Sequence, residues 1–427
     1  MPEWIWDSVG YFGGKIIPGI AGLLSVAIFI RLIGVAEYGR LAVLVPILMA
    51  IGSACSGWLA QGILRFHPAE NNNDDAECHS FHLAIRRGSV YSLLAVGFLV
   101  IILLRLWHYE INSILISVAF CSGLVAYSIL LSKLQADLRP GLVLRQEAIR
   151  SIAALAIPVI LILITGSRKF ELIVLGQAIA YGIALLFVPR HRSPKTEARQ
   201  STQNLGSIVS SNKASIAQLW MFGWAVGAWL LLSQFLPVID RSVIQKFTGD
   251  ANAGTYASLY EVAVRSLSFL LFPLTQAAHP RIMRMWNADE YSGAYRIIRH
   301  SILGQCLIFA GIFVLVSVEA PWITRHILGF ADDSAARTLP VLILGGFLWQ
   351  LALLLHKPME IAKQTVTMLT GISLALAINL LCCFAFIPRF GYSAAAYILV
   401  LSGLCYGAFT LFVTRFSIFI DREPSRA

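Results

Sequence analysis

Long apolar runs separated by short polar turns make up almost the whole chain. Because a bilayer core of about 30 Å needs about 20 apolar residues in a helix, most of these runs have the length of one membrane span. A helix satisfies its own backbone hydrogen bonds, as lipid requires, and the pattern lacks the short alternating segments of a transmembrane barrel. The predicted spans are residues 9–33, 40–64, 83–106, 111–134, 142–165, 170–189, 216–239, 253–278, 297–318, 338–356, 364–387 and 392–418.

Composition agrees with this pattern. The 427 residues are 57% hydrophobic and 13% charged, whereas a soluble domain carries about 25% charged residues. The first apolar run, residues 9–33, is too long for the apolar region of a signal peptide and has no basic segment before it, so we expect it to remain as the first span. The sequence therefore predicts an all-α polytopic membrane protein with twelve transmembrane helices.

A polar turn near the start of the chain has a second copy in the other half. Residues 28–65 and 243–281 each contain an apolar run, a glycine-containing polar turn and a second long run. All the matching residues are separated by the same number of positions, which indicates an internally duplicated membrane protein. The matching pairs are Arg31 with Lys246, Gly34 with Gly249, Gly39 with Gly254, Ala42 with Ala257 and Gln61 with Gln276.

The longest polar stretch, residues 190–213, is basic and rich in serine. It predicts a linker between an N-terminal six-helix lobe, residues 1–189, and a C-terminal six-helix lobe, residues 214–427. Because six is an even number, both lobes enter the membrane in the same orientation. The two lobes are then parallel repeats, with a cleft expected between them.

The net charge of +10 has a simple explanation in membrane orientation. If the N-terminus is cytoplasmic, roughly two-thirds of the 33 lysines and arginines fall on the cytoplasmic side, as the positive-inside rule requires. This predicts that both termini are cytoplasmic, and it leaves no need for a nucleic acid partner. No P-loop sequence occurs, and the seven cysteines show no disulfide or zinc pattern. We therefore expect no cofactor and no metal.

Three short motifs resemble those of a known family. The turn Arg31–Gly39, RLIGVAEYG, resembles the RLLGPxEYG turn of Wzx-type polysaccharide flippases, members of the multidrug/oligosaccharidyl-lipid/polysaccharide (MOP) exporter superfamily. Residues 61–66 resemble the end of helix two in this family. Residues 240–244, followed by residues 254–256, resemble its segment between helices seven and eight. Val35 stands where the family often has proline.

The resemblance implies a fold of two six-helix lobes, MATE-like in layout, and it also implies a function. Such proteins move an undecaprenyl-pyrophosphate-linked oligosaccharide across the bacterial inner membrane by alternating access, and a proton or sodium gradient is proposed to drive them. The implied partners are this lipid-linked sugar, H+ or Na+, membrane lipid and the polysaccharide polymerase machinery. The implied protein is a transporter and not an enzyme.

A pyrophosphate headgroup requires cations along its path. Charged side chains inside a membrane are costly, so each one is a functional candidate. Arg265 is the foremost candidate because it lies near the middle of the span 253–278, although Glu261, one turn earlier, could instead pair with it to join helices. The complete set of candidate substrate-binding residues is Lys15, Arg31, Arg65, Arg150, Arg241 and Arg265.

Each of the other cations also has a structural interpretation. Lys15 could extend to the membrane interface, Arg31 lies in the turn, and Arg150 could pair with Glu147 three residues earlier. Two acids, Asp240 and Glu261, are the candidate ion-coupling residues.

Two other functions remain open from the sequence. A multidrug exporter of the same superfamily would favour buried carboxylates over buried cations. A membrane glycosyltransferase or polysaccharide polymerase would need a large polar loop, and the longest polar stretch here is residues 190–213. A purely structural scaffold would leave the charges within the spans unexplained.

Overall fold

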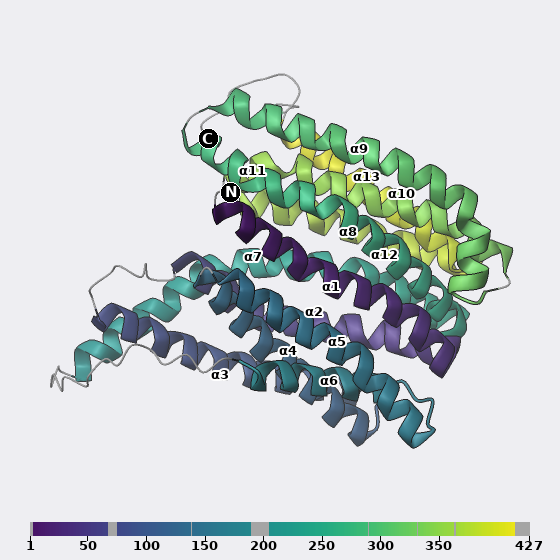
Figure 1. Cartoon of the computed structure of the whole chain (residues 1–427), viewed down its shortest axis with the longest axis horizontal. Helices are drawn as coiled ribbons and strands as arrows, with labels where there is room; N and C mark the ends of the chain where they lie inside the picture. Colours follow the sequence, from purple (N-terminus) through teal and green to yellow (C-terminus); the bar gives the residue numbers. More distant parts are fainter. Residues whose placement is uncertain are drawn as a thin grey trace. The chain divides into compact units, whose positions relative to one another are not determined.

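The structure is a computed structural model that describes residues 3–66, 75–137, 139–188, 205–288, 290–330, 332–362 and 364–414. Within these ranges every regular element is helical (Figure 1). The elements are α1 (Glu3–Ile33), α2 (Val35–Phe66), α3 (Asp75–Leu106), α4 (Ile111–Ala136), α5 (Pro140–Thr165), α6 (Glu171–Leu186), α7 (Leu205–Thr248), α8 (Asp250–Asn287), α9 (Tyr291–Trp322), a π-helical turn η1 (Ile323–Ile327), α10 (Asp333–Leu355), α11 (Lys357–Ile361), α12 (Thr365–Phe390) and α13 (Ser393–Val413).

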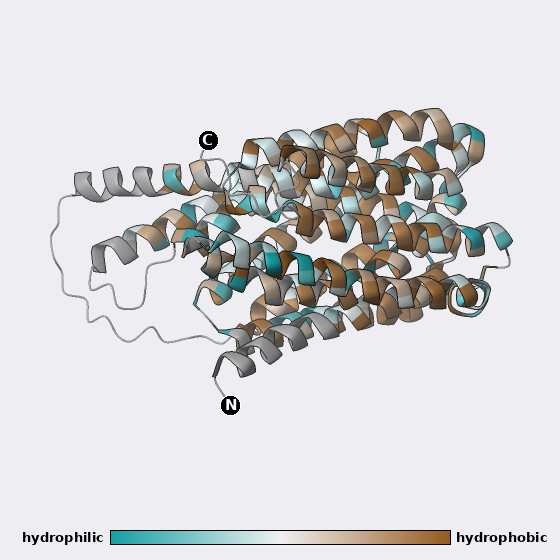
Figure 2. Ribbon diagram, turned by 90° about the horizontal axis from the view of Figure 1, so that it is seen from above, coloured by the Kyte–Doolittle hydropathy of each residue, from teal (hydrophilic) through white to brown (hydrophobic). Residues whose placement is uncertain are grey.

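Each predicted span falls largely on one helix, and α11 is an additional short helix. In the described chain, eight helical segments are long and apolar enough to cross a bilayer, and the shorter apolar helices Ile17–Ile33 and Glu171–Leu186 accompany them. Figure 2 shows apolar residues along the helices and polar ones concentrated toward their ends. The protein is therefore a multi-pass membrane protein. Of the predicted linker, residues 190–204 lie outside the described residues, and Leu205 begins α7.

The eight apolar spans are Val35–Phe66, Ser80–Leu106, Ile111–Ala136, Gly141–Thr165, Tyr291–Ile327, Asp333–Ile361, Thr365–Phe390 and Ser393–Val413.

The duplicated turns share one backbone conformation. Gly34 has φ 84° and Gly249 has φ 90°, values that glycine adopts without the steric penalty of a Cβ atom. The backbone N–H of Gly34 donates to the carbonyl of Ile30, and that of Gly249 donates to the carbonyl of Gln245. Ile30 and Gln245 have the same spacing along the chain as the two glycines, so the repeat seen in the sequence also exists in the geometry of the turn.

The contacts divide the chain into two compact units whose boundaries fall within helices α1, α2 and α7. Unit 1 comprises Met1–Pro18, Leu48–Ile164 and Glu171–Leu231, and unit 2 comprises Gly19–Ile47, Thr165–Phe170 and Leu232–Ala427. These boundaries differ from those of the predicted lobes, and the division into lobes remains a prediction.

Unit 1 is built around helices α3, α4 and α6. Helix α4 packs on both α3 and α6 (Figure 1). The ring of Tyr181 on α6 lies between two aromatic rings of α4, with centroid distances of 5.7 Å to Phe120 and 5.6 Å to Tyr127. These large buried rings fix the spacing of the two helices.

Unit 2 is built around α10, which packs on α8, α9 and α13, while α12 packs on α13. Its largest fully buried side chains include Tyr256, Tyr295 and Tyr406. At one end of the unit, the hydroxyl of Tyr392 donates to Asp332 at 3.0 Å. Burial raises the pKa of Tyr392 to about 12, so this residue remains a protonated donor that joins the α9–α10 and α12–α13 connections.

Helices α2 and α8 meet at the repeat-related glycines Gly39 and Gly254, both within unit 2. A Cβ atom added to Gly39 would lie 2.9 Å from the backbone nitrogen of Gly254 and would overlap the carbonyl of Asp250. A Cβ atom added to Gly254 would lie 3.0 Å from the nitrogen of Gly39 and would overlap the carbonyl of Val35. The two backbones are therefore in direct contact, and each half of the duplication supplies one glycine.

We expect Gly39→Ala to lower the melting temperature of the purified protein, because the new methyl group meets backbone that cannot move aside. Overpacking of this kind costs about 1–3 kcal/mol. Gly97→Ala on α3 is the matched control, since a Cβ atom there meets open space, and it should not destabilise the protein. Equal melting temperatures for the two variants would contradict the close contact.

Candidate functional site

A carboxylate placed between two arginines forms the charged centre of unit 2. On α8, Glu261 accepts from Nη2 of Arg241 at 2.7 Å, and its other oxygen accepts from Nε of Arg265. Arg241 comes from α7, and Arg265 lies one helical turn beyond Glu261. Glu261 cancels one of the two positive charges, so the three residues together, here called the Arg–Glu–Arg triad, carry one net positive charge.

The two arginines of the triad differ in exposure. The side chain of Arg241 is 3% exposed, whereas that of Arg265 is 45% exposed. A Cβ atom on Gly22 of α1 would overlap the guanidinium of Arg265, so that group lies directly against the α1 backbone. Arg265 is the member of the triad that an anion could reach.

Arg241 also ties α7 to α2. Its Nη1 donates to the carbonyl of Ala42 at 3.2 Å, and its guanidinium lies 4.9 Å from the ring centroid of Tyr260. A buried guanidinium needs such partners because an unpaired buried charge is very costly. In this structure Arg241 is a joint between helices as well as a cation.

Asp240 is fully buried beside the triad, one residue before Arg241. Its carboxylate accepts from the hydroxyl of Tyr256 at 2.9 Å, from Nδ2 of Asn379 at 3.1 Å and from the thiol of Cys383 at 3.3 Å. Asn379 also donates to the hydroxyl of Ser402 at 3.2 Å. Helices α7, α8, α12 and α13 therefore meet at one buried carboxyl group.

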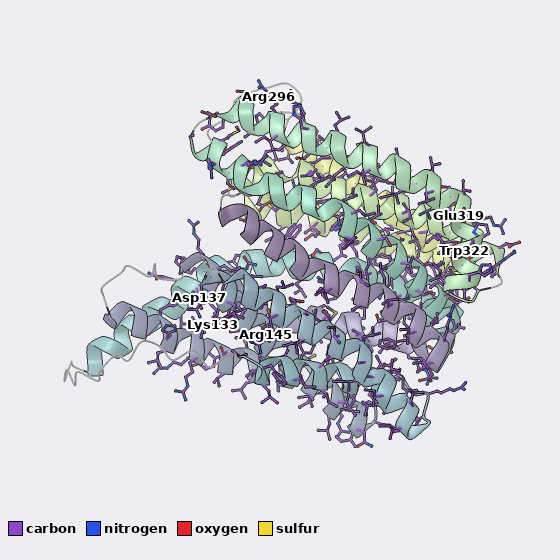
Figure 3. All side chains as sticks on the ribbon, viewed as in Figure 1. Lys133, Asp137, Arg145, Arg296, Glu319 and Trp322 are labelled. Atoms are coloured by element: carbon purple, nitrogen blue, oxygen red, sulfur yellow. The ribbon has the colours of Figure 1, made fainter. Side chains whose placement is uncertain are left out.

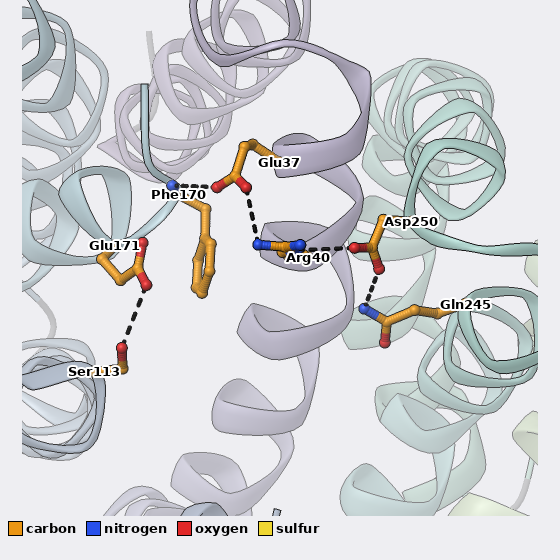
Figure 4. Close-up of polar contacts among 7 residues, drawn as sticks. All are labelled: Glu37, Arg40, Ser113, Phe170, Glu171, Gln245 and Asp250. Carbon is orange, nitrogen blue, oxygen red and sulfur yellow. Dashed lines mark hydrogen bonds and ion pairs between the residues drawn. The ribbon is translucent and has the colours of Figure 1, made fainter. Parts of the chain in front are cut away.

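A surface network surrounds the Gly34 turn of unit 2 (Figure 4). Arg40 on α2 pairs with Glu37 at 3.0 Å and with Asp250 at 2.8 Å. Glu37 accepts from the backbone N–H of Phe170 at 3.1 Å, and Asp250 accepts from Gln245 at 2.8 Å. These contacts bind the first copy of the turn to the beginning of α8, which follows the second copy.

Arg31, in the last turn of α1, contacts the end of the π-helical turn η1. Its guanidinium donates to the backbone carbonyls of His326 and Ile327, the latter at 3.2 Å. Carbonyl groups at the end of a helix have no partner within that helix. Arg31 therefore caps η1 in this structure.

Unit 1 holds a second charged cluster on α5. Arg150 pairs with Glu147 at 2.8 Å and donates to Ser151 at 3.1 Å. Its guanidinium lies 5.6 Å from the ring centroid of Tyr127 and 5.8 Å from that of Tyr181. The glutamate neutralises this arginine and the two aromatic faces cover it.

Two further predicted cations, Arg65 and Lys15, belong to α2 and α1. Arg65 is exposed near the end of α2, and the side chain of Lys15 on α1 lies outside the described residues. Figure 3 shows other charged residues near helix ends, with Arg296 near the beginning of α9 and Glu319 near its end beside Trp322. The triad and the Asp240 site, by contrast, lie within the bundle of unit 2.

The structure brings together three predicted residues, Arg241, Glu261 and Arg265, and places Asp240 beside them. It does not join Arg31, Arg65 or Arg150 to this group. Sequence reasoning missed Asn379, Cys383 and Tyr256. Asn379 had a usable signal, because it is an asparagine within the apolar run 365–390.

The chain is similar over nearly its whole length to solved membrane transporters. An inward-facing multidrug resistance MATE family transporter of the MOP superfamily matches with a TM-score of 0.67 and 12% identity, covering 96% of this chain and 98% of that one. A lipid II flippase MurJ in an inward closed conformation matches with a TM-score of 0.60 and 13% identity, covering 97% of this chain and 89% of that one. A comparison with curated protein sequences finds no match.

The chain is an α-helical membrane protein with the fold of these MOP superfamily structures. The chain belongs to the family of polysaccharide biosynthesis proteins, whose profile matches residues 4–286. This membership confirms the resemblance found in the sequence. The similar solved proteins named above are themselves a transporter and a flippase.

We expect Glu261→Gln to lower the melting temperature more than Arg265→Gln does. Losing Glu261 leaves the buried Arg241 without its carboxylate, and breaking a buried pair from one side costs about 3–5 kcal/mol. Losing Arg265 leaves Glu261 still paired with Arg241. Thermal unfolding in detergent measures both variants, and the opposite ranking would show that Arg241 does not depend on Glu261.

Proposed function

We propose that this protein is a flippase that moves a pyrophosphate-linked oligosaccharide on an undecaprenyl carrier across the bacterial inner membrane. The observation that carries the proposal is the net positive charge of the Arg–Glu–Arg triad, with Arg265 partly exposed on α8. Membership of the polysaccharide biosynthesis family supports a sugar-containing substrate.

The exposed part of the Arg265 side chain must face lipid or a polar path. An arginine in contact with lipid at the bilayer midplane costs at least about 2.5–3.5 kcal/mol, yet Arg265 keeps 45% of its side chain exposed. We infer that it faces a polar path instead. A guanidinium binds phosphate oxygens with two parallel hydrogen bonds, so the triad suits a pyrophosphate headgroup while the lipid tails stay in the bilayer.

The proposed architecture has twelve spans, with α7 and α8 completing the set despite their charges. Two six-helix lobes, residues 1–189 and 214–427, are joined by residues 190–213, and both termini are cytoplasmic. The lobes exchange between inward-open and outward-open states, as expected for a transporter with repeated halves. The similar MurJ protein is a flippase of lipid II, which supports this transport mode for the shared fold.

Within the substrate path, Arg265 is the principal cation and Arg241 supports it through Glu261. Arg150 is a second candidate cation in unit 1, while Lys15, Arg31 and Arg65 remain predicted contacts along the path. Ion coupling is proposed at Asp240 rather than Glu261, because two arginines already neutralise Glu261. We propose H+ as the coupling ion at Asp240, since a hydroxyl, an amide and a thiol all donate to its carboxylate and would stabilise it after the proton leaves.

A multidrug exporter is the second candidate, favoured by the similarity to a MATE family transporter. An exporter of cationic drugs should expose an acidic site, whereas the triad here is net positive. A deletion strain tested against dyes and antibiotics separates the two functions, because a drug exporter predicts increased sensitivity and a flippase predicts loss of surface polysaccharide.

We expect Arg265→Gln to reduce polysaccharide export at least about tenfold, because the variant loses the exposed cation of the triad but keeps the Arg241–Glu261 pair. The readout is surface polymer in cells whose own copy is replaced by the variant. Arg325→Gln is the matched control, since Arg325 also pairs with an acid, Asp333, but lies near a helix end. Normal export by Arg265→Gln, at equal protein level, removes Arg265 from the mechanism.

We expect Asp240→Asn to uncouple transport from the proton gradient. Asparagine keeps the size of the side chain but cannot take up a proton, so collapsing the gradient with a protonophore should slow export by the native protein and not change the residual export by the variant. Equal protonophore sensitivity of the two proteins would contradict coupling at Asp240. Sensitivity to removal of sodium instead would assign a different ion.

A further inference from the structure

The motif Arg31–Gly39 contains a buried tyrosine, Tyr38, which is 6% exposed. Its backbone N–H donates to the carbonyl of Gly34 at 3.0 Å, but its hydroxyl makes no hydrogen bond to any residue that the structure describes. The hydroxyls of Tyr256 and Tyr392 in the same unit each donate to a carboxylate. Buried tyrosine hydroxyls usually have a partner of this kind, so a free one needs an explanation.

Helix α2 places Tyr38 beside the Arg–Glu–Arg triad. Ala42 lies one helical turn after Tyr38, and its carbonyl accepts from Nη1 of Arg241 at 3.2 Å. The residue directly after Tyr38, Gly39, is in backbone contact with α8, the helix that carries the other two residues of the triad. Tyr38 therefore lies where α2 meets both helices of the triad.

The charges of the triad reach the hydroxyl of Tyr38. All three residues act on it electrostatically, and Glu261 acts more strongly than either arginine. A tyrosine hydroxyl can donate to a carboxylate. In this structure, however, Oε1 of Glu261 accepts from Arg241 at 2.7 Å and its other oxygen accepts from Arg265. The structure thus holds a free donor beside a carboxylate that already has one donor on each oxygen.

Binding of an anion at Arg265 changes this arrangement. To bind phosphate oxygens with two parallel hydrogen bonds, the guanidinium of Arg265 must turn away from Glu261. One Glu261 oxygen then loses its donor while Arg241 keeps the other. A buried oxygen without a donor is unfavourable, so this loss opposes binding of the anion. A second donor for the released oxygen would favour binding.

We propose that Tyr38 is a positioning residue of the anion site, whose hydroxyl donates to the Glu261 oxygen that Arg265 releases when a diphosphate binds. This inference rests on the proposed binding of the diphosphate headgroup at Arg265. Tyr38 keeps its proton throughout, and only hydrogen bonds are exchanged. The reverse exchange returns Arg265 to Glu261 and releases the diphosphate. Both oxygens of Glu261 then have a donor whether the site is empty or occupied.

The test measures the affinity of the full chain in nanodiscs for undecaprenyl pyrophosphate. Tyr38→Phe removes only the hydroxyl, and we expect it to weaken binding at least about tenfold, because hydrogen bonds to charged groups are the stronger ones. In a Glu261→Gln background, which lacks the carboxylate, the same substitution should change the affinity less than about twofold. Tyr406→Phe is the matched control, since this buried hydroxyl of unit 2 lies beside His356, and it should bind like the native protein.

A second measurement avoids the Glu261→Gln background, which we expect to lower the melting temperature. A fluorine label on the ring of Tyr38 reports its hydrogen bonding through the ¹⁹F chemical shift. We expect the shift to change when undecaprenyl pyrophosphate is added to the otherwise native protein, and to stay constant in Arg265→Gln. A constant shift in the native protein at saturating probe would contradict the role of Tyr38.

The outcomes separate this role from the function on which it rests. Native affinity in Tyr38→Phe, with weaker binding by Arg265→Gln, overturns the inference and leaves the proposed anion site standing. The buried Nε of Arg241, which has no partner in the described part of the chain, would then be the donor to test. An equal loss of affinity with and without Glu261 also overturns the inference, because Tyr38 would act independently of that carboxylate. Absence of binding by the native protein overturns both proposals.

Discussion

Glu261 lies between two guanidinium groups, and this arrangement lets a helical bundle keep two arginines within a membrane. One carboxylate satisfies the buried Arg241 and orients the partly exposed Arg265, so a single acid leaves one positive charge on α8. Arg241 in turn holds α2 through the carbonyl of Ala42. Binding an anion at Arg265 would therefore compete with Glu261, whose other partner joins helices. In this account, substrate binding and helix contact share one carboxylate.

The close contact of Gly39 with Gly254 places a second constraint on the same region. Each half of the duplicated sequence supplies one of these glycines, and the surrounding pairs of Arg40 with Glu37 and Asp250 reinforce the contact. Pairs this exposed contribute little stability individually. The contact between α2 and α8 therefore depends on the approach of the two backbones more than on the surface pairs.

Much of the fold could be predicted because each membrane helix appears in the sequence as an apolar run of about 20 residues. The duplication was also visible in the sequence, and the positive φ angles of Gly34 and Gly249 show that both copies of the turn have the same backbone conformation. The composition of the site was harder to predict from the sequence. Glu261 and Arg265 are one turn apart and could be paired from spacing, but Arg241 is on another helix. Asn379 contacts Asp240 although the two residues are far apart in the sequence. The spacing of residues within one helix cannot predict a contact of this kind.

The most direct test of the central claim is the sidedness of lipid-linked oligosaccharide in cells depleted of this protein. The account predicts that undecaprenyl-pyrophosphate-linked repeat units accumulate on the cytoplasmic face of the inner membrane and that polymer is lost. Accessibility to a sugar-modifying reagent in intact cells and in inverted vesicles measures the two faces separately. A normal distribution of these lipids between the faces would contradict the account.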